Sequence, residues 1–192
     1  IRTPSRTQKI AVAGMLNAVG LSATVVPSDG FLVLTRRNAR MSSGRGGRHI
    51  SVNEGMQPSD VLGGSLDPAV GLVRGIDEEL GISDVESSLV RFHSAIFDLD
   101  RYQFGLLGHV DLSGTDTSWQ RVTERRLTGI AKDKVEARRL ERIPWNPDAV
   151  IGALMDPDWV AHGWVNLLLS AISSFPTRAD DLLKVQASVE GV

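Results

Sequence analysis

Two adjacent glutamates, Glu78 and Glu79, follow Arg74 in the segment RGIDEELGI, which spans residues 74–82. Carboxylate oxygens are the hard ligands that Mg²⁺ prefers, so a pair of glutamates can bind a divalent cation. In a helix Arg74 and Glu78 lie one turn apart and can form an ion pair that holds the carboxylate in place. The same residue types are also typical of a solvated helix surface that carries no site.

The element that must position these side chains is predicted to be a helix over residues 68–80. Asp67 can accept a hydrogen bond at the N-cap, a proline follows it at the first helical position, and Gly81 is a typical helix stop. One core-facing stripe is expected, formed by Val73, Ile76 and Leu80. The arginine and the glutamates fall on the opposite side of this helix.

A hairpin and a short strand are predicted before this helix. The runs 22–26 and 31–36 are rich in β-branched and apolar residues and flank the Asp-Gly turn at 27–30, which suits a tight hairpin. Residues 49–53 alternate as a short strand. Residues 56–67 contain one proline and two glycines and indicate a mobile insertion.

Further strands and helices are predicted after the helix at 68–80. Two strand-like segments, 88–97 and 101–112, form a second hairpin candidate around Asp98-Leu99-Asp100. Residues 118–139 are charged and mostly helical in composition, with Gly129 as an interruption. The closing elements are an edge strand over 140–145 and helices over 148–155 and 159–173.

The segment 74–82 resembles the second half of the Nudix box, whose family pattern is G-x5-E-x7-R-E-U-x-E-E-x-G-U, with U a bulky aliphatic residue. Six of the seven fixed positions in that half match, namely Arg74, Ile76, Glu78, Glu79, Gly81 and Ile82. The resemblance extends over roughly residues 20–145, where hairpin, Arg-Arg pair, strand, loop and helix follow in the same order. It implies an α+β fold, the Nudix-type α/β/α sandwich with a mixed central sheet.

The resemblance also implies an activity, the Mg²⁺-dependent hydrolysis of a nucleoside diphosphate linked to another moiety. Mg²⁺, or Mn²⁺ in its place, would neutralise the pyrophosphate oxygens and orient a water molecule. By the same resemblance Glu78 and Glu79 are catalytic metal ligands and Arg74 orients a glutamate, while the general base stays unassigned. The expected ligand is small and nucleotide-like.

Two positions depart from the family pattern. Gly75 stands where the family has a glutamate that is often a metal ligand or the general base, and Leu66 stands where an earlier glutamate is expected. If residues 56–67 are an insertion, Glu54 can supply the third metal-binding carboxylate, and Asp67 is the alternative. Because Gly75 can neither bind a metal nor accept a proton, a second hypothesis is a Nudix-like module that senses or binds a nucleotide without cleaving it.

A basic, glycine-rich loop over residues 43–49 is the candidate for phosphate recognition. Its Arg45 and Arg48 are predicted to contact phosphate, because forked guanidinium groups donate paired hydrogen bonds to such oxygens. Arg37 ends the preceding strand beside Arg36, so one of the two faces the functional side, and Arg37 is taken as the substrate-binding residue. A solvated surface loop is the competing interpretation.

Composition places few limits on function. The 192 residues fit one domain, with an extension and short helix at 1–19, a Nudix-like domain at 20–175 and a tail at 176–192. Hydrophobic residues make up 42% and charged residues 23%, as in ordinary globular proteins. A net charge of −2 gives no specific signal for nucleic acid.

The cysteine count and the apolar runs limit the remaining classes. With no cysteine the chain has no disulfides and no thiolate metal sites, which fits a cytoplasmic protein. No apolar run is long enough for a spanning helix, so no membrane partner is expected. A homodimer and a role as a structural domain of a larger protein are open alternatives.

Overall fold

A mixed sheet of seven strands forms the centre of the computed structural model, which describes residues 19–38, 46–99, 103–128 and 137–190. The strands are β1 (Val19–Val26), β2 (Phe31–Arg37), β3 (Arg48–His49), β4 (Val52–Gly55), β7 (Val90–Asp98), β8 (Gln103–Asp111) and β9 (Ala137–Pro144). Their order is β3-β2-β1-β8-β7, with β4 paired to β1 and β9 paired to β2. Strands β1 and β8 are parallel and the other pairs antiparallel, so the predicted mixed sheet is confirmed.

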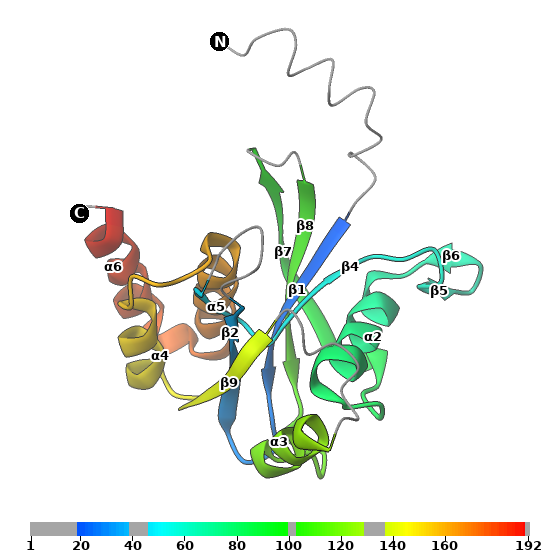
Figure 1. The fold of residues 1–192 in the computed structure, drawn as a ribbon. Coiled ribbons are helices and arrows are strands. Elements are labelled where there is room, and N and C mark those ends of the chain that lie inside the picture. The colour runs from blue at the N-terminus through cyan, green and yellow to red at the C-terminus, as the bar shows by residue number, and fades with distance from the viewer. Residues whose placement is uncertain (1–18, 39–45, 100–102, 129–136, 191–192) are drawn as a thin grey trace, which may run out of the picture.

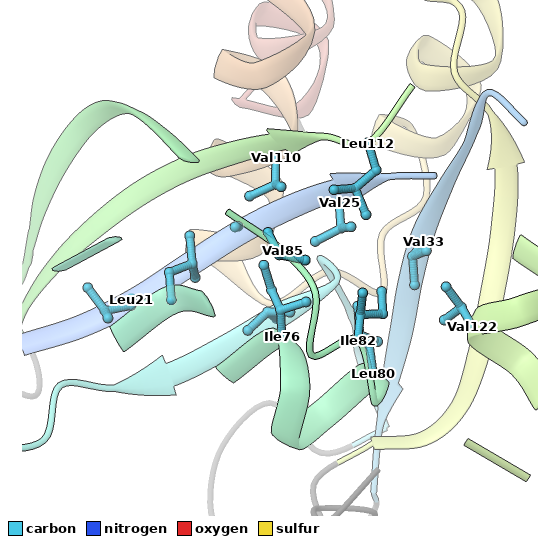
Figure 2. Packing of buried hydrophobic residues seen from close by; sticks show 13 residues of the cluster. Leu21, Val25, Val33, Ile76, Leu80, Ile82, Val85, Val110, Leu112 and Val122 are labelled. Carbon is cyan, nitrogen blue, oxygen red and sulfur yellow. The ribbon is translucent and has the colours of Figure 1, made fainter. Parts of the chain in front are cut away.

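Helices cover both faces of this sheet (Figure 1). They are α2 (Pro68–Leu80), α3 (Trp119–Leu127), α4 (Pro147–Leu154), α5 (Ala161–Ser174) and α6 (Ala179–Glu190), with 3₁₀ turns η2 (Ser87–Leu89) and η3 (Pro176–Arg178). One apolar core lies between the sheet and α2, where Leu21, Ile76 and Val110 pack together (Figure 2). A second core lies between the sheet and α4, α5 and α6. The architecture is therefore the predicted α/β/α sandwich.

Helix α2 begins and ends where the sequence predicts. Asp67 accepts a hydrogen bond from the Ala69 N–H at 2.8 Å, and Gly81 closes the helix with a φ of 72°. The buried stripe differs from the prediction at one position, because Leu72 is fully buried with Ile76 and Leu80 while Val73 is only partly buried.

The segment 56–67, predicted as a mobile insertion, contains a small two-stranded hairpin of β5 (Val61–Leu62) and β6 (Ser65–Leu66). Asp60, which is 1% exposed, accepts a hydrogen bond from the Gln57 N–H and an ion pair from Arg74, and these contacts fix the hairpin on α2.

Three predicted boundaries also change. The strand expected at 49–53 is split into β3 and β4, because the Ser51 side chain bonds the backbone of Val25 and Val33 in place of a strand partner. The helix expected at 118–139 ends at Leu127, and the described residues 137–139 belong to β9. Gly129 and the expected short helix at 1–19, apart from Val19 in β1, lie outside the described residues.

The segment 176–192, expected to be a tail, contains helix α6, which packs against the rest of the fold. Helix α6 lies against α4 and α5, and its Leu182 and Val185 are buried in the second core. Apolar residues at helical spacing make this segment part of the fold. Over the described ranges, no helix has the length and apolar character that crossing a membrane requires.

Candidate functional site

A pocket of about 250 Å³ lies beside the first residues of β1. Its floor and walls come from β1, β4, β7 and β8, and His162 of α5, Arg37 of β2 and Glu79 of α2 also line it. Strand pairing puts Asn53 of β4, Ser22 of β1 and Leu107 of β8 side by side across the sheet. Two helices and five strands thus converge on one concave site.

Glu79 connects α2 to this pocket. Its side chain lines the pocket although the residue is only 8% exposed. One carboxylate oxygen accepts a hydrogen bond from the Asn53 backbone N–H at 2.9 Å. The hydrogen bond from β4 fixes the orientation of this carboxylate at the pocket wall.

Arg74 gathers three carboxylates on the outer side of α2. Its Nε donates to Asp60 at 2.9 Å, and its Nη1 lies 3.3 Å from a Glu54 oxygen and 3.0 Å from a Glu78 oxygen. Its Nη2 donates to Asp60 at 3.1 Å and to the Gly55 carbonyl at 2.7 Å. The hydrogen bonds from Arg74 are the main cause that lowers the pKa of Asp60 below its usual value. The hydrogen bond to Asp60 is in turn the main cause that raises the pKa of Arg74.

Asp60 is the partner of Arg74 that the sequence did not predict. It comes from a segment taken as an insertion, and no local pattern marks it. The available signal was a pair of glycines, Gly71 and Gly75, one turn apart in a helix where each costs about 1 kcal/mol relative to alanine. A side chain at Gly71 would meet the Asp60 carboxylate at 2.7 Å, so this glycine makes room for the acid.

Gly75 makes room for Glu54 in the same way. A Cβ atom at position 75 would lie 2.9 Å from Glu54 Cβ, 3.1 Å from Glu54 Cγ and 3.1 Å from Val52 Cγ1. The stem of Glu54 therefore fills the space that a side chain at position 75 would need. Glu54 also lines the pocket, so β4 supplies a carboxylate next to position 75, where α2 has a glycine.

The predicted metal ligands converge only in part. Glu54 and Glu79 line the same pocket, whereas Glu78 turns toward Arg74 and is not part of the lining. Over the ranges that the structure describes, no three His, Cys, Asp or Glu side chains form a metal-binding group. Mg²⁺ is commonly held by one or two protein carboxylates together with substrate phosphates. The donor set of Glu54 and Glu79 therefore fits Mg²⁺ when the substrate contributes oxygens as well.

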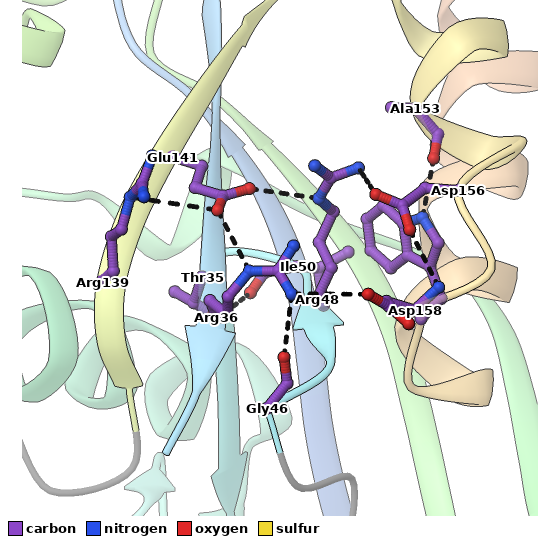
Figure 3. A network of polar contacts seen from close by, with 11 residues as sticks. Thr35, Arg36, Gly46, Arg48, Ile50, Arg139, Glu141, Ala153, Asp156 and Asp158 are labelled. Carbon is purple, nitrogen blue, oxygen red and sulfur yellow. Dashed lines mark hydrogen bonds and ion pairs between the residues drawn. The ribbon is translucent and has the colours of Figure 1, made fainter. Parts of the chain in front are cut away.

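The structure describes two of the three predicted phosphate-binding arginines, and only one of these lines the pocket. Arg37 lines the pocket. Arg48 is not part of the lining; it pairs with Glu141 at 3.2 Å and with Asp156 at 2.8 Å, and Figure 3 shows it between these acids. Arg45 lies outside the described residues. Glu141 is held by Arg36 and Arg48 in the same network.

Comparison with solved structures identifies the fold. The crystal structure of an ADP compounds hydrolase, a Nudix-type protein, matches at 13% identity with a TM-score of 0.57, over 85% of this chain and 76% of that chain. The chain has a Nudix-type fold. No protein-family model and no curated protein sequence matches it.

Two further solved structures with the Nudix-type fold match more loosely. The MutT protein from Methanosarcina mazei Go1 shares 16% identity over 78% of this chain and 88% of that chain, with a TM-score of 0.48. The protein DR0079 from Deinococcus radiodurans shares 16% identity over 72% of this chain and 73% of that chain, with a TM-score of 0.44.

The close packing around Gly75 of α2 leads to a stability prediction. We expect Gly75→Glu to destabilise the protein by about 1–2 kcal/mol, because overpacking against Glu54 and Val52 outweighs the gain in helix propensity. The exchange Gly75→Glu/Glu54→Gly should recover most of this loss, since it removes the side chain that is in the way. Urea unfolding of the two single variants and the exchange measures the coupling. Purely additive effects of the two changes would contradict the prediction.

Proposed function

We propose that the chain hydrolyses a nucleoside diphosphate linked to another moiety, in a Mg²⁺-dependent reaction at the pocket beside β1. The observation that carries the proposal is that Glu54 and Glu79, from different elements, line one pocket together with Arg37. Two carboxylates suit a divalent cation, and a guanidinium suits the phosphate oxygens of the substrate. The Nudix-type hydrolase fold adds support at the level of the fold.

In the proposed site Glu54 and Glu79 hold the metal, with Mn²⁺ as the alternative ion. When bound, the metal supplies charge neutralisation on the phosphate oxygens and lowers the pKa of a water molecule. The chain's own groups position the rest. The Asn53 N–H orients Glu79, and Arg74 orients Glu54 through the ion pair at 3.3 Å. Arg37, with Arg45 from the basic loop, contacts phosphate.

Glu78 and Arg48 take positioning roles in this proposal. Glu78 shares the Nη1 of Arg74 with Glu54 and so balances the charge of the guanidinium. Arg48 is left out of the phosphate-binding set, because its guanidinium already pairs with two acids. It holds β3 to the segment before α5, where its backbone also bonds Asp158 and Val160.

Nucleotide binding without cleavage is the second candidate function. Two observations favour it: helix α2 has a glycine at position 75, and Arg74 lies between Glu54 and Glu78, where a cation competes with it for the same oxygens. A protein of this kind would bind the nucleotide through Arg37 and turn it over slowly or not at all.

Turnover of a substrate panel separates the two functions. ADP-ribose, dinucleoside polyphosphates and nucleoside triphosphates are each incubated with Mg²⁺ or Mn²⁺, and product is measured by chromatography. The proposal expects turnover of at least one of them. Nucleotide binding in a thermal-shift assay without any cleavage would replace the hydrolase with the binding module.

Glu79→Gln tests the metal ligand directly. The substitution keeps the side chain's shape and its bond to Asn53 but removes the charge, so we expect the Mg²⁺ concentration for half-maximal activity to rise at least about tenfold. Glu86→Gln is the matched control, because Glu86 is exposed and lies outside the pocket. Equal Mg²⁺ dependence in both variants would remove Glu79 from the site.

A further inference from the structure

Three glycines from three neighbouring strands lie side by side on the pocket floor. Strand pairing aligns Gly55 of β4 with Gly20 of β1, and Gly20 with Gly105 of β8. All three line the pocket. We call this row of Gly20, Gly55 and Gly105 the glycine floor. Three adjacent positions without side chains leave a flat stretch of backbone in the middle of a pleated sheet.

Neither backbone conformation nor packing requires glycine at two of these positions. The glycines with a positive φ lie elsewhere, at positions 30, 46, 63, 64 and 81 of the described chain. A Cβ at Gly55 would meet nothing within 4 Å, and a Cβ at Gly20 would lie 3.4 Å from Gln103 Nε2 and 3.8 Å from the Phe104 carbonyl oxygen, which are ordinary contact distances. This contrasts with Gly71 and Gly75, where protein atoms occupy the space. Glycine in a strand interior weakens the strand and often marks a close approach of a ligand.

The walls of the glycine floor suit a planar ring. At Gly105 the Ile96 side chain leans over the strand, 3.3 Å from the position of a Cβ, and gives an apolar edge. The Gln103 amide borders the floor, with Nε2 3.4 Å from the position of a Cβ at Gly20, and Asp98, the cross-strand partner of Gln103, also lines the pocket. An amide both donates and accepts hydrogen bonds, as the edge of a nucleobase requires.

We propose that the glycine floor binds the planar nucleobase of the ligand, flat against the backbone of Gly20 and between Ile96 and Gln103. The identity of the ring as a nucleobase rests on the proposed function, whereas the flat floor and its walls do not. Burying one ring face against backbone and an aliphatic wall favours binding through the hydrophobic effect, and Gln103 adds a hydrogen bond to the ring edge.

The strand register also sets the direction of the bound nucleotide. Glu54 and Asn53, whose backbone N–H holds Glu79, lie on β4, next to Gly55 at one end of the floor. Gly105 lies two strands away at the other end, about 10 Å across the sheet. A base over Gly20, bordered by Ile96 at Gly105, therefore has the two carboxylates on its other side, toward β4, where its sugar and phosphates extend.

Binding of AMP and ribose 5-phosphate, measured by calorimetry with Mg²⁺ present, tests the floor, because the two probes differ only in the base. We expect AMP to bind at least about tenfold more tightly than ribose 5-phosphate, from the ring face that becomes buried. Gly20→Val should remove this preference, because its methyl groups would occupy the ring's place while valine is favoured in strands. Gly114→Val is the control, since Gly114 lies outside the pocket in open space.

The outcomes separate the floor from the proposed hydrolysis. Equal affinity of the unmodified protein for AMP and ribose 5-phosphate would contradict base binding at the glycine floor, whether or not any panel substrate is hydrolysed. A preference for AMP that remains in Gly20→Val would contradict it as well. A preference for AMP that is lost in Gly20→Val and kept in Gly114→Val supports base binding at the glycine floor, even if no substrate is cleaved. The unmodified protein alone decides the first comparison, so the test stands if the valine variant does not fold.

Discussion

Replacing Arg74 by alanine is expected to lower the free energy of unfolding by about 3–5 kcal/mol, the cost of breaking a buried ion pair by removing one partner. Asp60 is 1% exposed, and within the described residues its buried carboxylate would keep the Gln57 N–H as its remaining hydrogen-bond donor. Glu54 and Glu78 would lose the cation they share. For a chain of this size the melting temperature should fall by about 10 °C. Urea unfolding and a thermal melt measure both values.

Arg178→Ala is the matched control for this loss. Arg178 also bonds two carboxylates, those of Asp148 and Asp181, but its side chain is 39% exposed. Exposed ion pairs contribute between about zero and 1 kcal/mol, so the free energy of unfolding of this variant should be close to that of the wild type. Arg74→Lys should recover only part of the stability, because an ammonium cannot reproduce the fork on Asp60. Similar losses for Arg74→Ala and Arg178→Ala would show that burial of Asp60 has no special effect.

The dependence of the unfolding free energy on pH in the acid range gives a second measurement on the Arg74–Asp60 pair. Arg74 lowers the folded-state pKa of Asp60, so the contribution of the pair is present above the usual aspartate pKa and is lost as the pH falls through the lower folded pKa. Arg74→Ala should remove this dependence. The variant's stability should then change less than that of the wild type below about pH 4.

Local patterns were sufficient to predict most elements of the fold. The Asp-Gly turn gave the first hairpin, and Gly30 has the φ of 72° that such a turn needs. Asp67, Pro68 and Gly81 gave both ends of α2, because capping depends on residues next to the helix. Helix α6 was missed because its burial depends on contacts with α4 and α5, which a local pattern does not contain.

The arrangement of the site depended on contacts that sequence spacing does not contain. The Arg74–Glu78 pair lies within one helix turn and was predictable. Asp60 and Glu54 approach the same helix from other segments, and only the two glycines at positions 71 and 75 hinted at such close approach. The role of the glycines therefore became visible only with the neighbouring atoms in place. Position 75 of α2 has a glycine in place of the expected glutamate, and the side chain of Glu54 from β4 fills the space beside it.

Acidification from about pH 7 to pH 4 is expected to destabilise the protein strongly through buried histidines. Desolvation is the main cause that lowers the pKa of His49, His93 and His109 below the usual value, for His109 to about 4. His109 is 8% exposed and shares a hydrogen bond at 2.8 Å with Thr24, while His49 contacts His162. These groups stay neutral in the folded state at pH values where the unfolded chain takes up protons.

The direction of the effect follows from proton binding. Above about pH 6.5 both states carry neutral histidines and the folded state keeps its full stability. As the pH falls toward about 4, the unfolded state binds more protons than the folded state, so stability is lost, by about 3 kcal/mol for His109 alone. Asp60 and Glu141, whose pKa values are lowered, contribute to acid unfolding only at lower pH, which separates the two windows.

His109→Gln isolates one histidine from the others. Glutamine can keep a hydrogen bond to Thr24 but does not titrate, so the loss of stability between pH 6.5 and pH 4 should shrink by about 3 kcal/mol relative to the wild type. Urea unfolding at half-unit pH steps gives the difference as a slope, which a general loss of packing in the variant would not change. An unchanged slope would mean that His109 is protonated as readily in the folded state as in the unfolded chain. In that case the polar cluster of Thr24, His109 and Ser170, between the sheet and α5, would have to stabilise the charged imidazole.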